Sequence, residues 1–302
     1  MVKNLVLENI SVGFKLPQGV FYAVDDVSLN LPGGNFTAII GESGCGKSVL
    51  GQAILNILPS GVVKNGRVLY NGKQVKKILS AFGIIPQNPS ESLNPVRKIG
   101  KQMQDILNVH NIADSDNSYK KQCLHLFGLQ EAERVLAAYP HELSGGMLQR
   151  VLCAMAVSSK PEWILADEPT KGLDEQVGAV VRKNLLTIKQ DLHLSMLIIT
   201  HDIALAQEVC DDVLVMYAGQ VLEHNADIWH KPLHPYTKGF LQALPKNGLQ
   251  VIPGKAPVPG ESFTGCKFAA RCPYCTERCK EVMPAMQQIG DAEVRCFLYA
   301  EG

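Results

Sequence analysis

Gly41-Glu42-Ser43-Gly44-Cys45-Gly46-Lys47-Ser48 is the stretch that decides the fold. It fits G-x4-G-K-S/T, with an apolar strand over 36–40 before it and a helical pattern over 48–58 after it. In that context glycines let successive backbone N–H groups turn inward on phosphates, helped by the dipole of the helix. Lys47 is expected to reach the β- and γ-phosphates, and Ser48 to bind Mg²⁺. The predicted phosphate contacts of this phosphate-binding loop (P-loop) are Gly41, Glu42, Ser43, Gly44, Cys45, Gly46, Lys47, Ser48 and Val49.

A second apolar strand, residues 163–166, ends in two carboxylates, Asp167 and Glu168. In open α/β sheets ligands bind at the carboxyl ends of the strands. Asp167 suits the Mg²⁺ shell, and Glu168 is expected to polarise a water molecule in line with the γ-phosphate. Taken alone, an acidic pair after a strand is also ordinary chemistry for a helix start. The P-loop upstream is what favours the catalytic interpretation.

The pattern of apolar and polar residues changes along the chain. Residues 3–40 alternate apolar and polar in short stretches with turn signals between them, which predicts a small antiparallel sheet. Residues from about 90 to 158 have helical periodicity. From residue 162 strands and helices alternate, which implies right-handed crossovers and a mostly parallel sheet. We therefore predict an α/β domain over 1–230 with a helical insertion over about 90–158, and an extension over 231–302.

The composition indicates which partners the chain has and where in the cell it works. Its 302 residues include 29 Lys+Arg and 29 Asp+Glu, so no charge excess points to nucleic acid or an anionic membrane. No apolar run approaches the length that crosses a bilayer, and the first residues lack the apolar region of a secretory signal. The sequence therefore predicts a cytoplasmic protein that needs other subunits for any work in a membrane.

The stretch Leu143-Ser144-Gly145-Gly146-Met147 resembles the signature of the ATP-binding cassette (ABC) superfamily, with Met147 where Gln is commoner. The resemblance implies a P-loop NTPase fold: an ABC nucleotide-binding domain with an inserted helical subdomain, an N-terminal antiparallel β subdomain and here a Cys-rich C-terminal extension. In that family Ser144, Gly145 and Gly146 would bind the γ-phosphate held by the other protomer. On the residues alone, Ser144 is also a plain helix N-cap.

The same resemblance assigns further residues. Gln87 stands at the Q-loop, which contacts Mg²⁺ and the attacking water, and His201 at the switch histidine that touches the γ-phosphate. The stretch Lys171-Gly172-Leu173-Asp174 stands at the D-loop and keeps its Asp while departing from the common pattern before it. Family members stack adenine on an aromatic side chain upstream of the P-loop, for which Phe14 fits best and Tyr22 second. On the residues alone, either side chain is equally typical of core packing.

Five of the nine cysteines fall within the last 37 residues, which in a cytosolic protein favours a metal site over disulfides. The spacing Cys266-x5-Cys272-x6-Cys279-x16-Cys296 resembles the tail of oligopeptide, dipeptide and nickel importer ATPases, whose four cysteines can hold a 4Fe–4S cluster. Four thiolates also form a tetrahedral zinc site, and free thiols are the third possibility. Cys275 is extra to the pattern, either as a bystander or as an alternative ligand.

Together these features predict the ATPase subunit of a bacterial-type ABC importer for peptides or nickel, bound at the cytoplasmic face of the inner membrane. The implied partners are a second ABC ATPase, identical or related, two transmembrane permease subunits and, indirectly, an extracytoplasmic substrate-binding protein. ATP would close a head-to-tail dimer and hydrolysis would reopen it. The alternatives are a soluble ABC ATPase acting on nucleic acid or ribosomes, which the neutral charge opposes, and a P-loop regulator or kinase, which the Ser-Gly-Gly turn opposes.

Overall fold

The computed structural model describes residues 3–17, 19–74, 81–244, 248, 250–258 and 261–300. These residues form two compact units, each of which is described by itself. The first lies within Met1–Lys3, Pro32–Phe36 and Lys76–Val209, and the second within Asn4–Leu31, Thr37–Val75 and Cys210–Gly302. Within the described part of the chain, no helix has both the length and the apolar character that a membrane span requires.

The first unit contains a parallel sheet. Its strands are β6 (Phe82–Ile85), β7 (Trp163–Asp167) and β8 (Ser195–Ile199), and they pair in the order β6-β7-β8. Nearly all of their residues are buried, as expected for strands of a covered parallel sheet that read as continuous apolar runs. Helices α7 (Glu175–Leu192) and α8 (Ile203–Val209) follow β7 and β8 along the chain.

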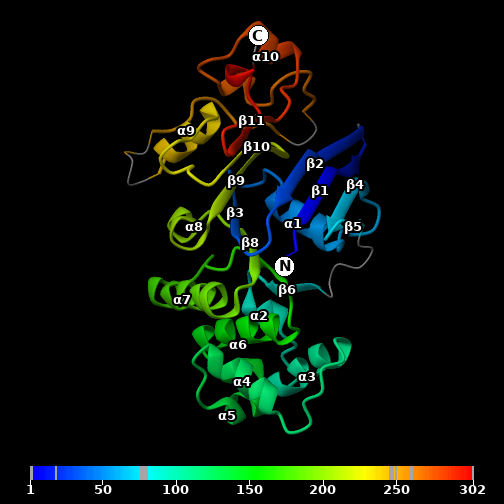
Figure 1. Ribbon diagram of the computed structural model, residues 1–302, viewed down its shortest axis with the longest axis vertical. Helices are drawn as coiled ribbons and strands as arrows, with labels where there is room; N and C mark the ends of the chain where they lie inside the picture. Colours follow the sequence, from blue (N-terminus) through cyan, green and yellow to red (C-terminus); the bar gives the residue numbers. More distant parts are fainter. Residues whose placement is uncertain are drawn as a thin grey trace. The chain divides into compact units, whose positions relative to one another are not determined.

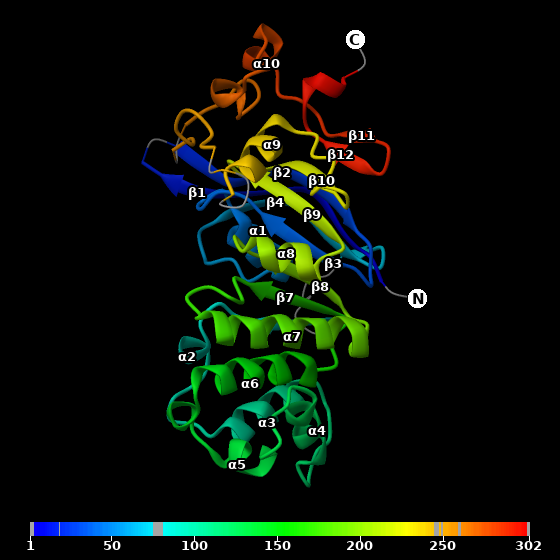
Figure 2. The ribbon, with the colours of Figure 1, turned by 90° about the vertical axis from the view of Figure 1, so that its left-hand side faces the viewer.

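The chain between β6 and β7 is helical. Its helices are α2 (Pro89–Ser92), α3 (Ile99–Val109), α4 (Ser118–Leu126), α5 (Ala132–Ala137), the short 3-10 helix η2 (Pro140–Glu142) and α6 (Gly145–Ser158). Helix α3 buries Ile99, Met103 and Leu107, which recur every four residues and so lie on one face. Helix α6 is buried along most of its length, and Figures 1 and 2 show it between α7 and the group formed by α3, α4 and α5.

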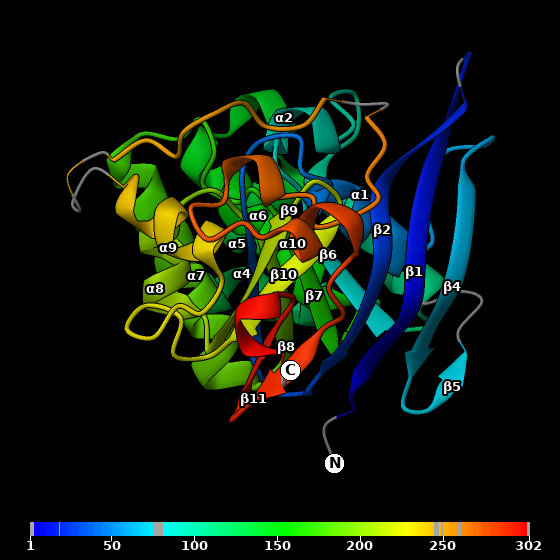
Figure 3. The same cartoon turned by 90° about the horizontal axis from the view of Figure 1, so that it is seen from above.

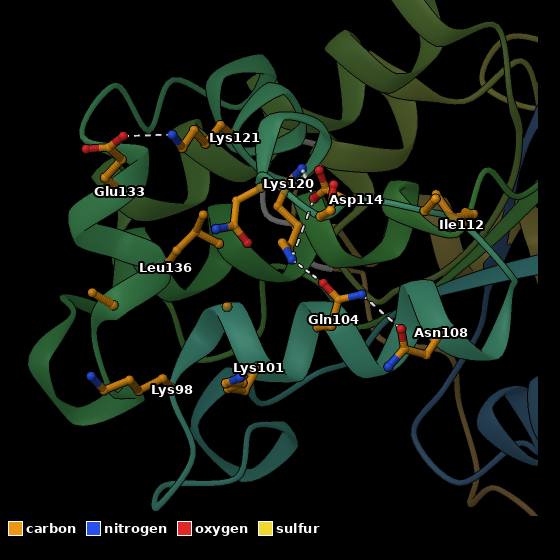
Figure 4. A pocket seen from close by; sticks show the side chains of 15 residues that line it. Lys98, Lys101, Gln104, Asn108, Ile112, Asp114, Lys120, Lys121, Glu133 and Leu136 are labelled. Carbon is orange, nitrogen blue, oxygen red and sulfur yellow. Dashed lines mark hydrogen bonds and ion pairs between the residues drawn. The ribbon is translucent and has the colours of Figure 1, made fainter.

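A buried ion pair joins the loop before α4 to the first turn of that helix, beside a hollow of about 820 Å³ (Figure 4). Asp114 accepts hydrogen bonds from the backbone N–H groups of Tyr119 and Lys120, each at 3.0 Å. The Lys120 ammonium lies 3.6 Å from the same carboxylate and also donates to the Gln104 side chain on α3. Both charged side chains are almost fully buried. Each charge is therefore compensated inside the protein.

The second unit begins with an antiparallel sheet. Its strands are β1 (Leu5–Leu16), β2 (Gly19–Leu31), β4 (Val63–Tyr70) and β5 (Lys73–Gln74), in the order β2-β1-β4-β5. Figure 3 shows β1 between β2 and β4. The predicted N-terminal antiparallel sheet is therefore confirmed.

Another sheet of this unit carries the P-loop. It joins β3 (Phe36–Ile40), β9 (Asp212–Tyr217), β10 (Gln220–Asn225), β12 (Ala292–Val294) and β11 (Gln287–Ile289) in that order. The pair β3–β9 is parallel and the later pairs are antiparallel. The end of the chain thus adds two strands to the sheet that holds the P-loop, which the sequence did not predict.

The helices of the second unit are short. They are α1 (Lys47–Leu55), α9 (Pro235–Gln242), α10 (Glu277–Glu281) and the 3-10 helices η4 (Ala269–Arg271) and η5 (Phe297–Tyr299). The pattern over 48–58 predicts a longer α1 than the structure has. The helix ends early because Asn56 adopts a left-handed conformation, φ 57°, and its N–H bonds back to the carbonyl oxygen of Ala53.

We expect Asp114→Ala to lower the free energy of unfolding by about 3 kcal/mol. The change leaves the Lys120 ammonium buried without its partner and removes the acceptor for two helix N-terminal amides. Urea denaturation at neutral pH measures the loss. The control is Glu131→Ala, which breaks an exposed pair with Arg134 and should change stability by less than about 0.5 kcal/mol. Equal losses in the two variants would contradict the role of the buried pair.

Candidate active site

The P-loop joins β3 to α1 and passes very close to neighbouring backbone. A Cβ atom added to Gly41 would lie 2.2 Å from the carbonyl oxygen of Met216, and one added to Gly46 would lie 2.1 Å from that of Ala23. Both glycines also have positive φ angles, 147° and 105°. Packing and backbone conformation therefore both require glycine at these two positions.

Lys47 lies inside the loop that precedes it. Its side-chain ammonium donates hydrogen bonds to the carbonyl oxygens of Gly41, at 2.9 Å, and Glu42, at 3.1 Å. Ser48 and Val49 follow in the first turn of α1, where helix N–H groups favour an anion. Burial raises the pKa of the neighbouring Cys45 thiol, which keeps it protonated at neutral pH. The loop thus offers a cation and helix amides in one place.

Groups outside the P-loop hold its backbone. The N–H of Gly219 donates to the carbonyl oxygen of Cys45 at 2.9 Å, and the N–H of Glu42 donates to the Tyr236 hydroxyl at 3.1 Å. The Arg271 guanidinium lies 3.1 Å from both carboxylate oxygens of Glu42. Tyr236 and Arg271 come from the C-terminal part of the chain. Sequence reasoning missed these contacts, because neither residue belongs to a P-loop motif.

A cavity of about 230 Å³ adjoins Gly44 of the P-loop. Tyr22 lines this cavity together with residues of the C-terminal part, among them Phe263 and Lys267. Phe14, the first choice for stacking adenine, does not line it and pairs with Phe21 across the β1–β2 ladder. Of the two predicted aromatic residues, the structure therefore places Tyr22 at the cavity beside the P-loop.

In the first unit, predicted catalytic residues follow the carboxyl ends of neighbouring parallel strands. Gln87 follows β6 and is exposed, Asp167 ends β7 with Glu168 next, and His201 follows β8. The strands pair in parallel up to these ends, so the three loops emerge at one edge of the sheet. This edge is where ligands bind in α/β folds.

Glu168 and His201 contact each other directly. The His201 Nδ1 atom lies 2.6 Å from the Glu168 carboxylate, which is nearly buried. The backbone of Glu168 has φ 48°, and its N–H donates to the carbonyl oxygen of Ile199 at 2.7 Å. A left-handed conformation is uncommon for a non-glycine residue, and such strain clusters at functional sites. The arrangement fixes a carboxylate and an imidazole that can orient and polarise a water molecule.

Helix α6 begins at the predicted signature turn. Ser144 is its N-cap, with a side-chain oxygen that accepts from the N–H of Met147 at 3.3 Å. A Cβ atom on Gly145 would meet nothing within 4 Å, and one on Gly146 would only reach Val177 at 4.0 Å. At the D-loop, Asp174 caps α7 in the same way. The start of α6 thus has space for another molecule beside its N–H groups.

The predicted cysteine ligands line one cavity of about 200 Å³ in the second unit. These are Cys266, Cys272, Cys279 and Cys296, while Cys275 is absent from the lining. Burial, together with the charges of the neighbouring cysteines, raises the pKa of Cys266 to about 11. Among the described residues, no three or more His, Cys, Asp and Glu side chains are arranged to hold a metal ion. The metal site therefore stays a prediction.

Two family models match the chain. The model described as ABC transporter matches residues 24–171, which include the P-loop, the signature turn and β7. The model described as oligopeptide/dipeptide transporter, C-terminal region, matches residues 222–279.

Relatives match over nearly the full chain. The oligopeptide transport ATP-binding protein OppD of Haemophilus influenzae is 35% identical over 98% of this chain and 98% of its own. The dipeptide transport ATP-binding protein DppD of Escherichia coli is 36% identical over 95% and 94%. Among solved structures, the ATP-binding cassette MJ0796, bound to ADP and Pi in a dimeric post-hydrolysis state, superposes with a TM-score of 0.62. It is 25% identical, and the match covers 73% of this chain and 97% of that one.

The P-loop, the acidic strand end and these matches define the class, which is an ABC ATPase with a P-loop NTPase fold. More narrowly, the chain belongs to the ATP-binding proteins of oligopeptide and dipeptide ABC transporters. The predicted family and ATPase activity are confirmed, and ATP and Mg²⁺ are the ligands that this membership implies.

We expect Glu168→Gln to lower the ATPase kcat by about 100-fold or more, because the amide cannot act as a base toward water. Affinity for ATP should stay the same. Phosphate release and equilibrium ATP binding measure the two quantities. The control is Glu208→Gln on α8, whose half-exposed carboxylate pairs with Arg182 and should leave both unchanged. Fast hydrolysis by Glu168→Gln would contradict the assignment.

Proposed function

We propose that this chain hydrolyses ATP to power the import of oligopeptides or dipeptides at the cytoplasmic face of the inner membrane. Its relatives named above are oligopeptide and dipeptide transport proteins, and its residues 222–279 match the C-terminal region of such transporters. These matches favour peptides over nickel as the cargo. They also favour transport over an action on nucleic acid or ribosomes. The partners are a second ABC ATPase, two permease subunits and an extracytoplasmic substrate-binding protein.

Each group at the site has a defined task in this proposal. Lys47 neutralises the β- and γ-phosphates, while Glu168 polarises the attacking water and His201 orients the Glu168 carboxylate and contacts the γ-phosphate. The short contact between Glu168 and His201 supports their acting together. Ser48, Gln87 and Asp167 would hold Mg²⁺, which would neutralise charge on the phosphates.

The observation that carries the dimeric mechanism is the space beside Gly145. The fold of this chain allows a side chain there, yet glycine occupies the position. We infer that Ser144, Gly145 and Gly146 approach the γ-phosphate held by the partner ATPase, because small residues and helix N–H groups permit close contact with an anion. ATP then bridges two chains and stabilises the closed dimer.

The helices between β6 and β7 act in the proposal as the inserted subdomain that meets the permease. A groove of about 440 Å³ is lined by residues of β6, α3 and α6. Its apolar lining includes Leu93 and Met155, and an ion pair of 2.6 Å between Arg97 and Asp105 stands in its wall. An apolar groove with charges nearby suits an amphipathic helix. We propose a cytoplasmic permease helix as its occupant.

The groove is continuous with the Q-loop. Pro86, which precedes Gln87, lines the groove, and so does Gly83 of β6. A helix that enters the groove therefore contacts the segment that carries Gln87. This continuity supports a route by which nucleotide-dependent movement of the Q-loop reaches the permease.

The side chains that line the cysteine cavity provide the kind of donor atoms that a sulfur-ligated group needs. Besides the four cysteines it is lined by His234, a fully buried residue whose Nδ1 accepts from the N–H of Tyr236 at 3.0 Å. Burial lowers the pKa of His234 to about 3, so the ring is neutral and its proton is on Nε2. That atom is buried and has no hydrogen-bond partner among the described residues. The backbone of Arg295 interacts with this ring, and the same N–H faces a cavity lined by sulfur atoms, which can also accept a hydrogen bond.

We therefore propose that Cys266, Cys272, Cys279 and Cys296 hold a 4Fe–4S cluster, with zinc as the rival. Such a cluster would cross-link the extension through its thiolates. Cys275, outside the cavity lining, has no part in the proposed ligand set.

We expect Gly145→Val to abolish dimer formation by ATP and to lower ATPase activity by on the order of 100-fold, because the added side chain occupies the space meant for the partner's phosphate. ATP binding and the thermal midpoint of the single chain should be unchanged. Size-exclusion chromatography in the Glu168→Gln background measures dimerisation. The control is Ser118→Val, at the first position of α4. Normal dimerisation by Gly145→Val would contradict the proposed mechanism.

We expect the full chain purified without oxygen to be brown and to contain about four iron and four sulfide per chain, because four thiolates complete one cubane cluster. Absorbance near 400 nm and metal analysis measure this. Cys279→Ser should remove the cluster, while Cys275→Ser should keep it. One zinc per chain with no colour would assign the site to zinc. Metal-free protein would contradict the proposal of a metal site.

A further inference from the structure

Arg271 belongs to the C-terminal extension, where it ends η4 next to Cys272. Its side chain is only 7% exposed. Nη1 lies 3.1 Å from each carboxylate oxygen of Glu42 and 3.3 Å from the Tyr217 hydroxyl, and Nε donates to the carbonyl oxygen of Pro253 at 3.1 Å. The planar guanidinium is therefore fixed by several acceptors, and its orientation is set by the fold of the extension.

The partner of this arginine is a P-loop residue. Glu42 directly follows Gly41, and its own backbone N–H is held by the Tyr236 hydroxyl. A free carboxylate at this position would oppose the binding of a polyanion, because like charges in a partly buried site repel one another. The guanidinium cancels this charge where the loop would meet the phosphates.

The surroundings of Arg271 keep it in place. Tyr217, Tyr236 and Phe268 form an aromatic cluster with ring centroids 4.6 to 5.4 Å apart. The guanidinium lies 5.7 Å from the ring centroid of Tyr217 and 5.9 Å from that of Phe268. The cluster joins β9, α9 and the segment before η4. The same packing thus supports both the hydroxyl that holds Glu42 and the arginine that neutralises it.

We propose that Arg271 is a positioning residue of the ATP site, which raises affinity for MgATP by neutralising the Glu42 carboxylate of the P-loop. The extension is then part of the nucleotide site as well as of the cysteine site. This inference rests on the proposed binding of the ATP phosphates at Gly41–Ser48. A purely structural clamp makes a different prediction: removal of either partner would harm the site, and removal of both would not restore it.

The test is MgATP binding by the full chain, together with KM and kcat in the assembled transporter. Arg271→Gln should raise Kd and KM about tenfold, with kcat changed less than about twofold, because an uncompensated carboxylate weakens binding and leaves Glu168 in place. Adding Glu42→Gln to this variant should return Kd to within about threefold of the parent. Glu42→Gln alone should lower Kd about threefold, because the guanidinium charge then acts on the phosphates unopposed.

Controls separate the possible failures. Lys231→Gln removes an exposed charge of the same unit and should leave Kd unchanged. Lys47→Ala should abolish binding; if it binds normally, the P-loop assignment and this inference fail together. If Lys47→Ala fails to bind but Arg271→Gln binds normally, only the role of Arg271 is overturned. A double variant as weak as Arg271→Gln overturns neutralisation in favour of a clamp, and Glu42→Gln tests the same charge should Arg271→Gln not fold.

Discussion

The P-loop lies in close contact with the backbone of two neighbouring strands. The structure of the second unit depends on this constraint. Gly46 packs against the backbone of Ala23 on β2, and Gly41 against that of Met216 on β9, at distances that exclude any side chain. The loop can present its N–H groups only while these two strands stay in place. The antiparallel sheet that contains β2 and the parallel pair β3–β9 therefore support the P-loop together. Close packing transmits a displacement of either strand to the loop.

The sequence predicts the strand ends well, because covered parallel strands are continuous apolar runs and the polar motif residues follow them directly. It places Glu168 and His201 after two such runs, but their contact depends on the register of β7 with β8 and on the left-handed backbone of Glu168. Neither property has a local sequence signal. The same reasoning explains α1, whose early end depends on the conformation adopted by Asn56.

In the C-terminal part, some features can be predicted from the sequence and others cannot. The spacing of the cysteines identifies four of them as a set, and the cavity lining separates the same four from Cys275. The strands β11 and β12 have three residues each, too few to show a period of two. His234 and Arg271 gain their significance only from tertiary contacts, the first from the cavity that it lines with the four cysteines and the second from a carboxylate more than 200 residues away.

Glycine serves two different purposes in this chain, and the structure separates them. At Gly41 and Gly46 the protein's own backbone leaves no room for a side chain. At Gly145 the chain leaves that room open, and alanine at a helical position would stabilise the fold by about 0.5 to 1 kcal/mol relative to glycine. Packing within the chain therefore gives no reason for glycine at the start of α6. This is the basis of our proposal that a phosphate presented by a second ATPase lies there, which would need both small residues and available N–H groups.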